Sequence, residues 1–118
     1  MISKALVAAS TKPMILSILS SGEHYGYQII QKVKGLSGGT IEWSDGMLYP
    51  VLHRLEKDRL ITSDWKMSDG GRHRKYYTVT ARGMEELAGD MQEWMCVHDV
   101  LSKLWTPLQM NTMRPAEV

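Results

Sequence analysis

The pattern of apolar residues changes twice along this chain of 118 residues, from helical to strand-like and back to helical. The runs Ile61 to Met67 and Arg72 to Thr80 are rich in Trp, Tyr, Thr and Val, which favour strands. They flank a Ser-Asp-Gly-Gly sequence at residues 68–71, which is typical of a hairpin turn. The two runs therefore predict a two-stranded ribbon with helical segments on both sides of it.

Three helices are predicted before the ribbon, and the start of the first is open. In one arrangement a short helix has Thr11 as its N-cap, Pro13 in its first turn and Gly22 at its end. In the other, one longer helix starts near Lys4, and Pro13 kinks it. Both arrangements fit the pattern of apolar residues.

The second predicted helix spans about residues 25–36 and ends at the Ser-Gly-Gly of residues 37–39. The third has Ser44 or Asp45 as its N-cap and ends near Arg59. Apolar residues at helical spacing are expected to be buried. These are Tyr27, Ile29, Ile30 and Val33 in the second helix and Leu48, Val51, Leu52 and Leu55 in the third.

Thr80 is the expected N-cap of a last long helix, which starts at Ala81 and ends near Thr106. Pro107 should stop this helix, because proline removes a backbone donor and clashes with the preceding turn. One stripe of the helix repeats with heptad spacing: Met84, Leu87, Met91, Trp94, His98, Leu101 and Trp105. We expect this stripe to form a homodimer interface that includes His98, although it could also cover the first helix of its own domain.

The order helix, helix, helix, ribbon, helix, with short connections, is that of a winged helix-turn-helix. The expected fold class is mainly α (α+β). Residues 1–80 would form the winged helix DNA-binding domain, and residues 81–118 the C-terminal dimerisation helix and a tail.

The chain is nearly neutral, with 14 Lys and Arg against 13 Asp and Glu, which at first argues against a DNA-binding protein. The charges are unevenly placed, however. Residues 1–83 carry 12 Lys and Arg and 7 Asp and Glu, a net charge of +5, whereas residues 84–118 carry 2 and 6, a net charge of −4. The basic excess lies in the predicted winged domain, so the objection does not stand.

Composition and motifs exclude several other classes of protein. A hydrophobic content of 43% and a single cysteine, Cys96, argue against a disordered tail and a disulfide scaffold. The sequence contains neither an apolar run that could span a membrane nor a signal peptide pattern, so we expect a cytoplasmic protein. The four histidines, His24, His53, His73 and His98, match no metal or catalytic motif. We therefore expect no enzyme activity, no metal and no other cofactor.

The third helix carries candidate DNA-binding residues, because the start of the second helix of a helix-turn-helix meets base edges. Pro50 is tolerated only near the start of a helix, which supports a start close to Asp45. The residues at intervals of four from Tyr49 form a row on one face. The alternative is an ordinary surface helix with a polar face. The candidates are Ser44, Asp45, Met47, Tyr49, Pro50, His53 and Lys57.

The ribbon carries a second set of candidates, Arg72, Arg74 and Lys75, beside its glycine tip. On a strand, Arg72 and Arg74 share one face, whereas His73 and Lys75 share the other. A mobile basic ribbon can reach along a groove of DNA and place cations against phosphates. The alternative is an exposed hairpin that charge makes soluble.

Five blocks occur together in this sequence: His-Tyr-Gly-Tyr-Gln-Ile from His24, Ser-Gly-Gly-Thr from Ser37, Met-Leu-Tyr-Pro-Val-Leu-His-Arg-Leu-Glu-Lys-Asp from Met47, Leu-Ile from Leu60, and Gly-Arg-His-Arg-Lys-Tyr-Tyr-Thr-Val-Thr-Ala-Arg-Gly from Gly71. In these blocks the chain closely resembles the PadR family of bacterial transcriptional regulators. The resemblance runs from about Thr11 to Gly83, and in general shape to the end of the last helix.

The resemblance implies a dimeric winged-helix repressor that binds an inverted repeat of double-stranded DNA near a promoter. By position it adds Tyr25, at the start of the first helix of the motif, to the DNA-binding candidates. Members of the family often have Gly at the position of Arg59. If that position needs a positive φ, Arg59 is slightly strained there; alternatively, Arg59 extends the phosphate-binding surface.

Family members of this type often respond to small aromatic molecules, so the resemblance also implies such an effector. Trp94 and Trp105, with Met91 and Met95 nearby, could line a flat apolar slot between two subunits; simple packing in the interface is the alternative. A different class of function also stays open, a winged helix that binds proteins or senses ligands without reading DNA. Asp45 at the base-reading end keeps it open, because phosphates repel a carboxylate.

Overall fold

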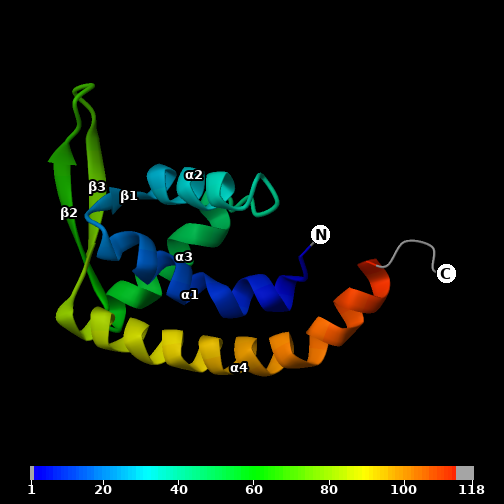
Figure 1. The fold of residues 1–118 in the computed structure, drawn as a ribbon. Helices are drawn as coiled ribbons and strands as arrows, with labels where there is room; N and C mark the ends of the chain where they lie inside the picture. Colours follow the sequence, from blue (N-terminus) through cyan, green and yellow to red (C-terminus); the bar gives the residue numbers. More distant parts are fainter. Residues whose placement is uncertain (1, 114–118) are drawn as a thin grey trace. The chain divides into compact units, whose positions relative to one another are not determined.

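The computed structural model describes residues 2–113, and their side chains as far as Leu108. It confirms the mainly helical winged helix-turn-helix with a small antiparallel sheet (Figure 1). The chain divides after Leu87 into two compact units. The helices are α1 (Lys4–Ser20), α2 (Gly26–Leu36), α3 (Asp45–Lys57) and α4 (Ala81–Met113), and the strands are β1 (His24–Tyr25), β2 (Ile61–Met67) and β3 (His73–Val79).

The first helix is the longer of the two predicted arrangements, with Pro13 inside it. Ser3 is its N-cap and accepts a hydrogen bond from the Leu6 N–H at 3.2 Å. Thr11 is therefore not a cap. Its side chain is buried and donates to the Val7 carbonyl at 2.7 Å, so the hydroxyl is satisfied within the helix.

The predicted end of the last helix is wrong, because α4 continues through Pro107 to Met113. The Thr106 hydroxyl donates to the Ser102 carbonyl at 2.6 Å, which supports the helical turn just before the proline. At the other end of α4, Thr80 is the N-cap as predicted. Its hydroxyl accepts from the Gly83 N–H at 2.9 Å.

The sheet has the strand order β1-β3-β2, and both strand pairs are antiparallel. The hairpin of β2 and β3, called the wing below (residues 61–79), projects beyond the helices of its unit (Figure 1). Trp65 lies opposite Lys75 and Met67 opposite His73. The short β1 was not predicted, because two residues are too few to show an alternating pattern.

The core of the first unit lies between the three helices and the base of the sheet. Most of the expected residues are in it, with Val51 and Ile30 partly buried at its edge. Tyr27 was also expected in the core, and this is wrong, because the side chain is 59% exposed. The buried apolar residues are Ile15, Leu16, Ile18, Leu19, Ile29, Val33, Trp43, Leu48, Leu52, Leu55, Leu60, Ile61, Tyr77 and Leu87.

The turn between α3 and the wing contains a residue with a left-handed backbone. Arg59 has φ 63°, so the positive φ considered for this position is real. The Arg59 N–H donates to the Glu56 carbonyl at 3.0 Å and the Leu60 N–H to the Leu55 carbonyl at 2.9 Å. These two bonds form a Schellman motif, which ends the helix and usually has glycine at the position of Arg59.

Candidate nucleic-acid interface

The start of α3 presents a polar surface while the opposite face of the helix is held in the core. Ser44 is the N-cap, and its hydroxyl accepts from the Met47 N–H at 3.2 Å. Leu48, Leu52 and Leu55 are buried on the inner face. Met47 is half-buried, and the remaining candidates are exposed: Ser44, Asp45, Tyr49, Pro50, His53 and Lys57.

The starts of α2 and α3 are held against each other. The Tyr25 N–H caps α2 by donating to the Gln28 Oε1 at 3.0 Å. Gly26 follows and is buried, and a Cβ added there would lie only 2.8 Å from the Cζ of Tyr49. The phenol of Tyr49 therefore occupies the space that a side chain at position 26 would need. This fit fixes the row of α3 residues relative to the start of α2.

Aromatic contacts connect the start of α2 to the wing. The rings of Tyr25 and Tyr76 meet edge to face with centroids 5.3 Å apart. The guanidinium of Arg74 lies over the Tyr25 ring, with its carbon 4.3 Å from the centroid, which is cation–π distance. These contacts position Arg74 beside the two helix starts.

A cavity of about 450 Å³ lies between the wing and the starts of α2 and α3. Five of its lining side chains are aromatic and the other three are basic or histidine. No carboxylate lies among these residues, all of which the structure describes. We call this cavity the wing groove; it is lined by Tyr25, Tyr27, Tyr49, Trp65, His73, Arg74, Lys75 and Tyr77.

The lysine and the buried tyrosine of the wing groove also contact each other. The Nζ of Lys75 lies 5.9 Å from the ring centroid of Tyr77. Burial raises the pKa of Tyr77 to about 12, with smaller contributions from Tyr49 and Glu56, so its phenol is neutral at physiological pH. The groove can therefore receive an anion without repulsion from this phenol.

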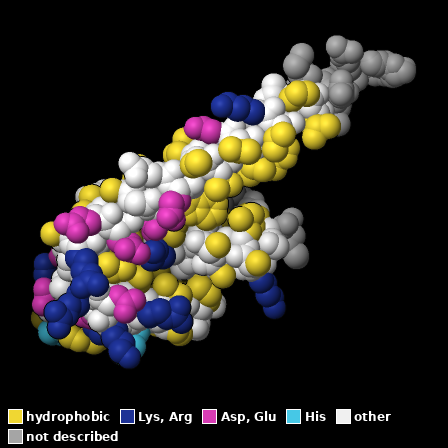
Figure 2. All heavy atoms as spheres, turned by 90° about the horizontal axis from the view of Figure 1, so that it is seen from below, with side chains coloured by type: hydrophobic (Ala, Val, Ile, Leu, Met, Phe, Trp, Pro, Cys, Tyr) yellow, Lys and Arg dark blue, Asp and Glu magenta, His cyan; other side chains and the backbone are white. Residues whose placement is uncertain are grey.

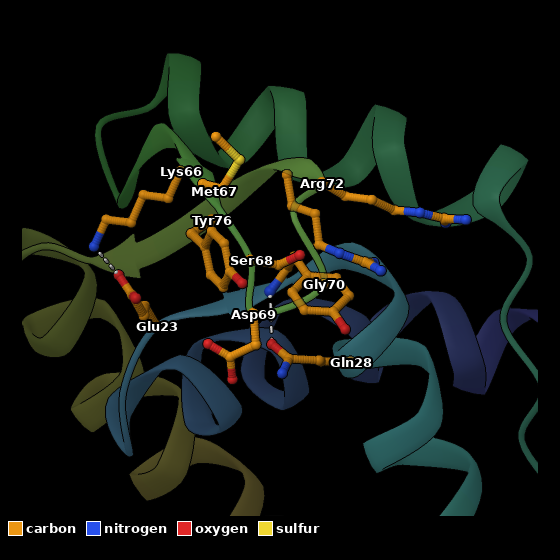
Figure 3. Close-up of a pocket in the computed structure, with 11 residues that line it drawn as sticks. Glu23, Gln28, Lys66, Met67, Ser68, Asp69, Gly70, Arg72 and Tyr76 are labelled. Atoms are coloured by element: carbon orange, nitrogen blue, oxygen red, sulfur yellow. Dashed lines mark hydrogen bonds and ion pairs between the residues drawn. The ribbon is translucent and has the colours of Figure 1, made fainter.

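A second cavity, of about 470 Å³, lies along the wing and contains Arg72 (Figure 3). Its lining includes two carboxylates, those of Glu23 and Asp69. Glu23 pairs with Lys66 at 2.6 Å, and this hydrogen-bonded carboxylate raises the pKa of Lys66. Because Lys66 is paired and carboxylates are present, this cavity is less suited to a polyanion than the wing groove is.

The structure thus brings Tyr25, Tyr49, Arg74 and Lys75 together in the wing groove, whereas Arg72 lines the second cavity. Sequence reasoning missed Trp65 as a groove residue. Counting residues back from the hairpin turn would have indicated it, because this register places Trp65 opposite Lys75.

The heptad stripe of α4 falls on both units. Leu87 is buried in the core of the first unit, and Met84 there is 43% exposed. In the second unit, no described side chain from Ala88 to Leu108 is buried, and Leu101 is half-buried. Figure 2 shows hydrophobic side chains along the length of this helix. The exposed ones include Met91, Trp94, Met95, Val97, Val100, Leu104, Trp105 and Leu108.

Over the residues that the structure describes, none of the helices has the length and apolar character that crossing a membrane requires. Over the same residues, we find no group of three or more His, Cys, Asp or Glu side chains suited to a metal ion.

The chain is similar to known bacterial regulators over most of its length. It is 37% identical over 82 residues to the transcriptional regulator Rv3488 of Mycobacterium tuberculosis, which covers 70% of this chain and 73% of that protein. It is 31% identical to the transcriptional regulator YqjI of Escherichia coli over 68% of this chain, but over only 37% of that protein. The crystal structure of a PadR-like transcriptional regulator from Bacillus cereus superposes with a TM-score of 0.78 at 32% identity, over 87% of this chain and 98% of the other.

The residues that match a known family include the wing groove and the helices that line it. Residues 15–89, which include both helices of the motif, the whole wing and the start of α4, match the transcriptional regulator PadR-like family. The chain is therefore a transcriptional regulator that belongs to the PadR-like family.

Proposed function

We propose that this regulator binds double-stranded DNA, with the start of α3 in the major groove and the wing in the adjacent minor groove. The observation that carries the proposal is the wing groove, where two cations and four tyrosine side chains meet without a carboxylate. The DNA backbone between the two grooves would pass through it. Lys and Arg neutralise phosphates there, and tyrosine hydroxyls donate hydrogen bonds to them.

Base reading would fall to the exposed start of α3. Ser44 and Asp45 lie at its N-terminal end, and Tyr49 and His53 lie one and two turns further along. A carboxylate at the reading end accepts a hydrogen bond from the amino group of cytosine, so Asp45 would favour cytosine at the base that it faces.

The regulator would act as a homodimer on an inverted repeat. The support is the apolar surface of α4, on which Met91 is 56% and Trp105 50% exposed. Exposed apolar stripes of this length mark interaction sites, and heptad spacing suits a second helix of the same kind. Residues 1–80 would then be the DNA-binding domain and residues 81–118 the dimerisation part, and a dimer carries two wings for two half-sites.

Regulation would be repression that a small aromatic ligand releases. The proposed ligand site is the slot of Met91, Trp94, Met95 and Trp105, whose side chains are all exposed on α4. Planar apolar molecules stack on tryptophan and would quench its fluorescence. Quenching that persists unchanged after Trp94→Ala would contradict this slot.

The test of DNA binding is a titration with the DNA upstream of the regulator's own gene, at several salt concentrations. Arg74→Gln with Lys75→Gln should weaken binding to every DNA sequence and lower the slope of log K against log salt by about 1 to 2. The matched control is Lys4→Gln with Lys103→Gln, which removes the same charge from two exposed sites outside the wing groove.

Two outcomes would contradict the proposal. If the parent protein shows no salt-sensitive binding to this DNA, the regulator acts through another partner. If the control pair lowers the slope as much as the wing pair does, the attraction comes from net charge and not from the wing groove.

A further inference from the structure

The wing carries two large apolar side chains that the fold does not use. Trp65 is 67% exposed and Met67 is 61% exposed, and neither belongs to the core of the same unit. They are two residues apart on β2, so both side chains lie on the same face of the wing. Exposed neighbours of this size on one face mark a contact surface.

The residues that pair with these two across the hairpin are a lysine and a histidine. Lys75 lies directly opposite Trp65 on β3, and His73 lies directly opposite Met67. Trp65, His73 and Lys75 all line the wing groove, among whose residues there is no carboxylate, whereas Met67 lines the second cavity with Glu23 and Asp69. The acidic residue of β2, Asp64, precedes Trp65 and therefore lies on the other face of the strand. An apolar strip with Lys75 beside it suits a polyanion with apolar walls.

Minor-groove DNA is such a partner. Its walls are formed by the carbon atoms of the deoxyriboses, and phosphates line both of its edges. A strip of Trp65 and Met67 would contact the sugar walls while Lys75 faces the phosphates. We propose that Trp65 and Met67 form an apolar minor-groove contact, which contributes affinity for DNA that does not depend on salt. This inference rests on the proposed DNA binding.

The physical signature separates this contact from a phosphate contact. An ion pair with phosphate releases bound counterions, so its loss changes the slope of log K against log salt. An apolar contact releases water instead, so its loss lowers affinity by the same factor at every salt concentration. A titration at several salt concentrations therefore distinguishes the two kinds of contact.

The experiment measures the anisotropy of fluorescently labelled DNA, taken from upstream of the regulator's own gene, at four salt concentrations. The variant Trp65→Thr with Met67→Thr keeps a strand-favouring residue at both positions. It should raise Kd about tenfold at each salt concentration, as expected for loss of a central aromatic contact, and leave the slope unchanged. The single variant Trp65→Phe, which keeps an aromatic ring at this position, should bind DNA with most of the affinity of the parent protein. Lys75→Gln should lower the slope by about 1.

The control is Leu36→Thr, which removes another exposed apolar side chain, 77% exposed at the end of α2 and outside the wing groove. It should bind like the parent protein. If the parent binds and the Trp65 and Met67 variant binds equally well, or changes the slope as Lys75→Gln does, the apolar contact is refuted and the proposed function stands. If the parent does not bind DNA, both are refuted.

Discussion

The backbone of Arg59 permits a stability prediction with a definite sign. A residue other than glycine at φ 63° costs about 1 to 2 kcal/mol relative to a right-handed backbone, because the Cβ approaches the following carbonyl. Arg59→Gly removes this strain. The flexibility of glycine in the unfolded chain offsets about 0.5 to 1 kcal/mol of the gain. The net gain from the backbone alone is about 0.5 to 1 kcal/mol.

Arg59→Ala is the control that separates the backbone from the side chain. Alanine also has a Cβ, so the strain remains, while the guanidinium is lost in both variants. The guanidinium follows the C-terminus of α3, where a cation contributes about 0.3 to 1 kcal/mol through the helix dipole. Arg59→Ala should therefore be less stable than the parent, and Arg59→Gly should be more stable than Arg59→Ala by about 0.5 to 1 kcal/mol.

The assay is urea unfolding followed by circular dichroism, at one fixed protein concentration because an oligomer's stability depends on it. In thermal melts, the same difference should place the Tm of Arg59→Gly about 2 to 6 °C above that of Arg59→Ala. Equal stability of the glycine and alanine variants would refute the reasoning, since it would mean that the Schellman position carries no strain. A lower salt slope of DNA binding in both variants would instead assign Arg59 to the phosphate-binding surface.

Two further predictions concern the first turns of α4. A Cβ at Gly83 would collide with the Leu60 carbonyl, so Gly83→Ala should lower the free energy of unfolding by about 1 to 3 kcal/mol in urea titrations. Gly89→Ala on the same helix, where a Cβ meets nothing within 4 Å, should instead raise it by about 0.5 to 1 kcal/mol. Glu86 pairs with Lys12, which lowers the pKa of Glu86; the stabilisation is present above the ordinary pKa of 4.5 and is lost as pH falls through the lowered value. Glu86→Gln should thus be slightly less stable at pH 7, by under about 1 kcal/mol for so exposed a pair, and thermal melts should show the difference vanishing in acid.

Local signals predicted most of the fold. Ser44 and Thr80 are N-caps as expected, because their hydroxyls accept from the third backbone N–H that follows. The hairpin followed from a glycine turn between two strand-like runs. The prediction that α4 ends at Pro107 was wrong, because a proline near the end of a long helix can remove one hydrogen bond without ending the helix. Such an outcome depends on the turn around the proline, which a residue type alone does not specify.

The sequence predicted which elements carry the candidate site, but not which residues contact one another in it. Arg74 and Lys75 were identified from charge on a ribbon, yet the stacking of Arg74 on Tyr25 joins residues 49 positions apart. That contact follows from β3 pairing with β1, and β1 is too short to leave a pattern in the sequence. Charge patterns therefore located the cations, whereas the sheet order determined which aromatic rings stand beside them.

Tyr27 shows where the apolar spacing of a helix misleads. Spacing assigns a tyrosine or tryptophan to the core whenever it falls on an apolar stripe, because burial of such rings is usually favourable. Tyr27 lies on the stripe of α2, but its ring is exposed and lines the wing groove, where Trp65 is exposed as well. Exposing both rings costs hydrophobic free energy that the folded monomer does not recover. The apolar spacing that predicts the core elsewhere fails at Tyr27, and Trp65 is exposed in the same groove. A partner that covers these rings would account for both, and the cations beside them favour the anionic partner proposed above.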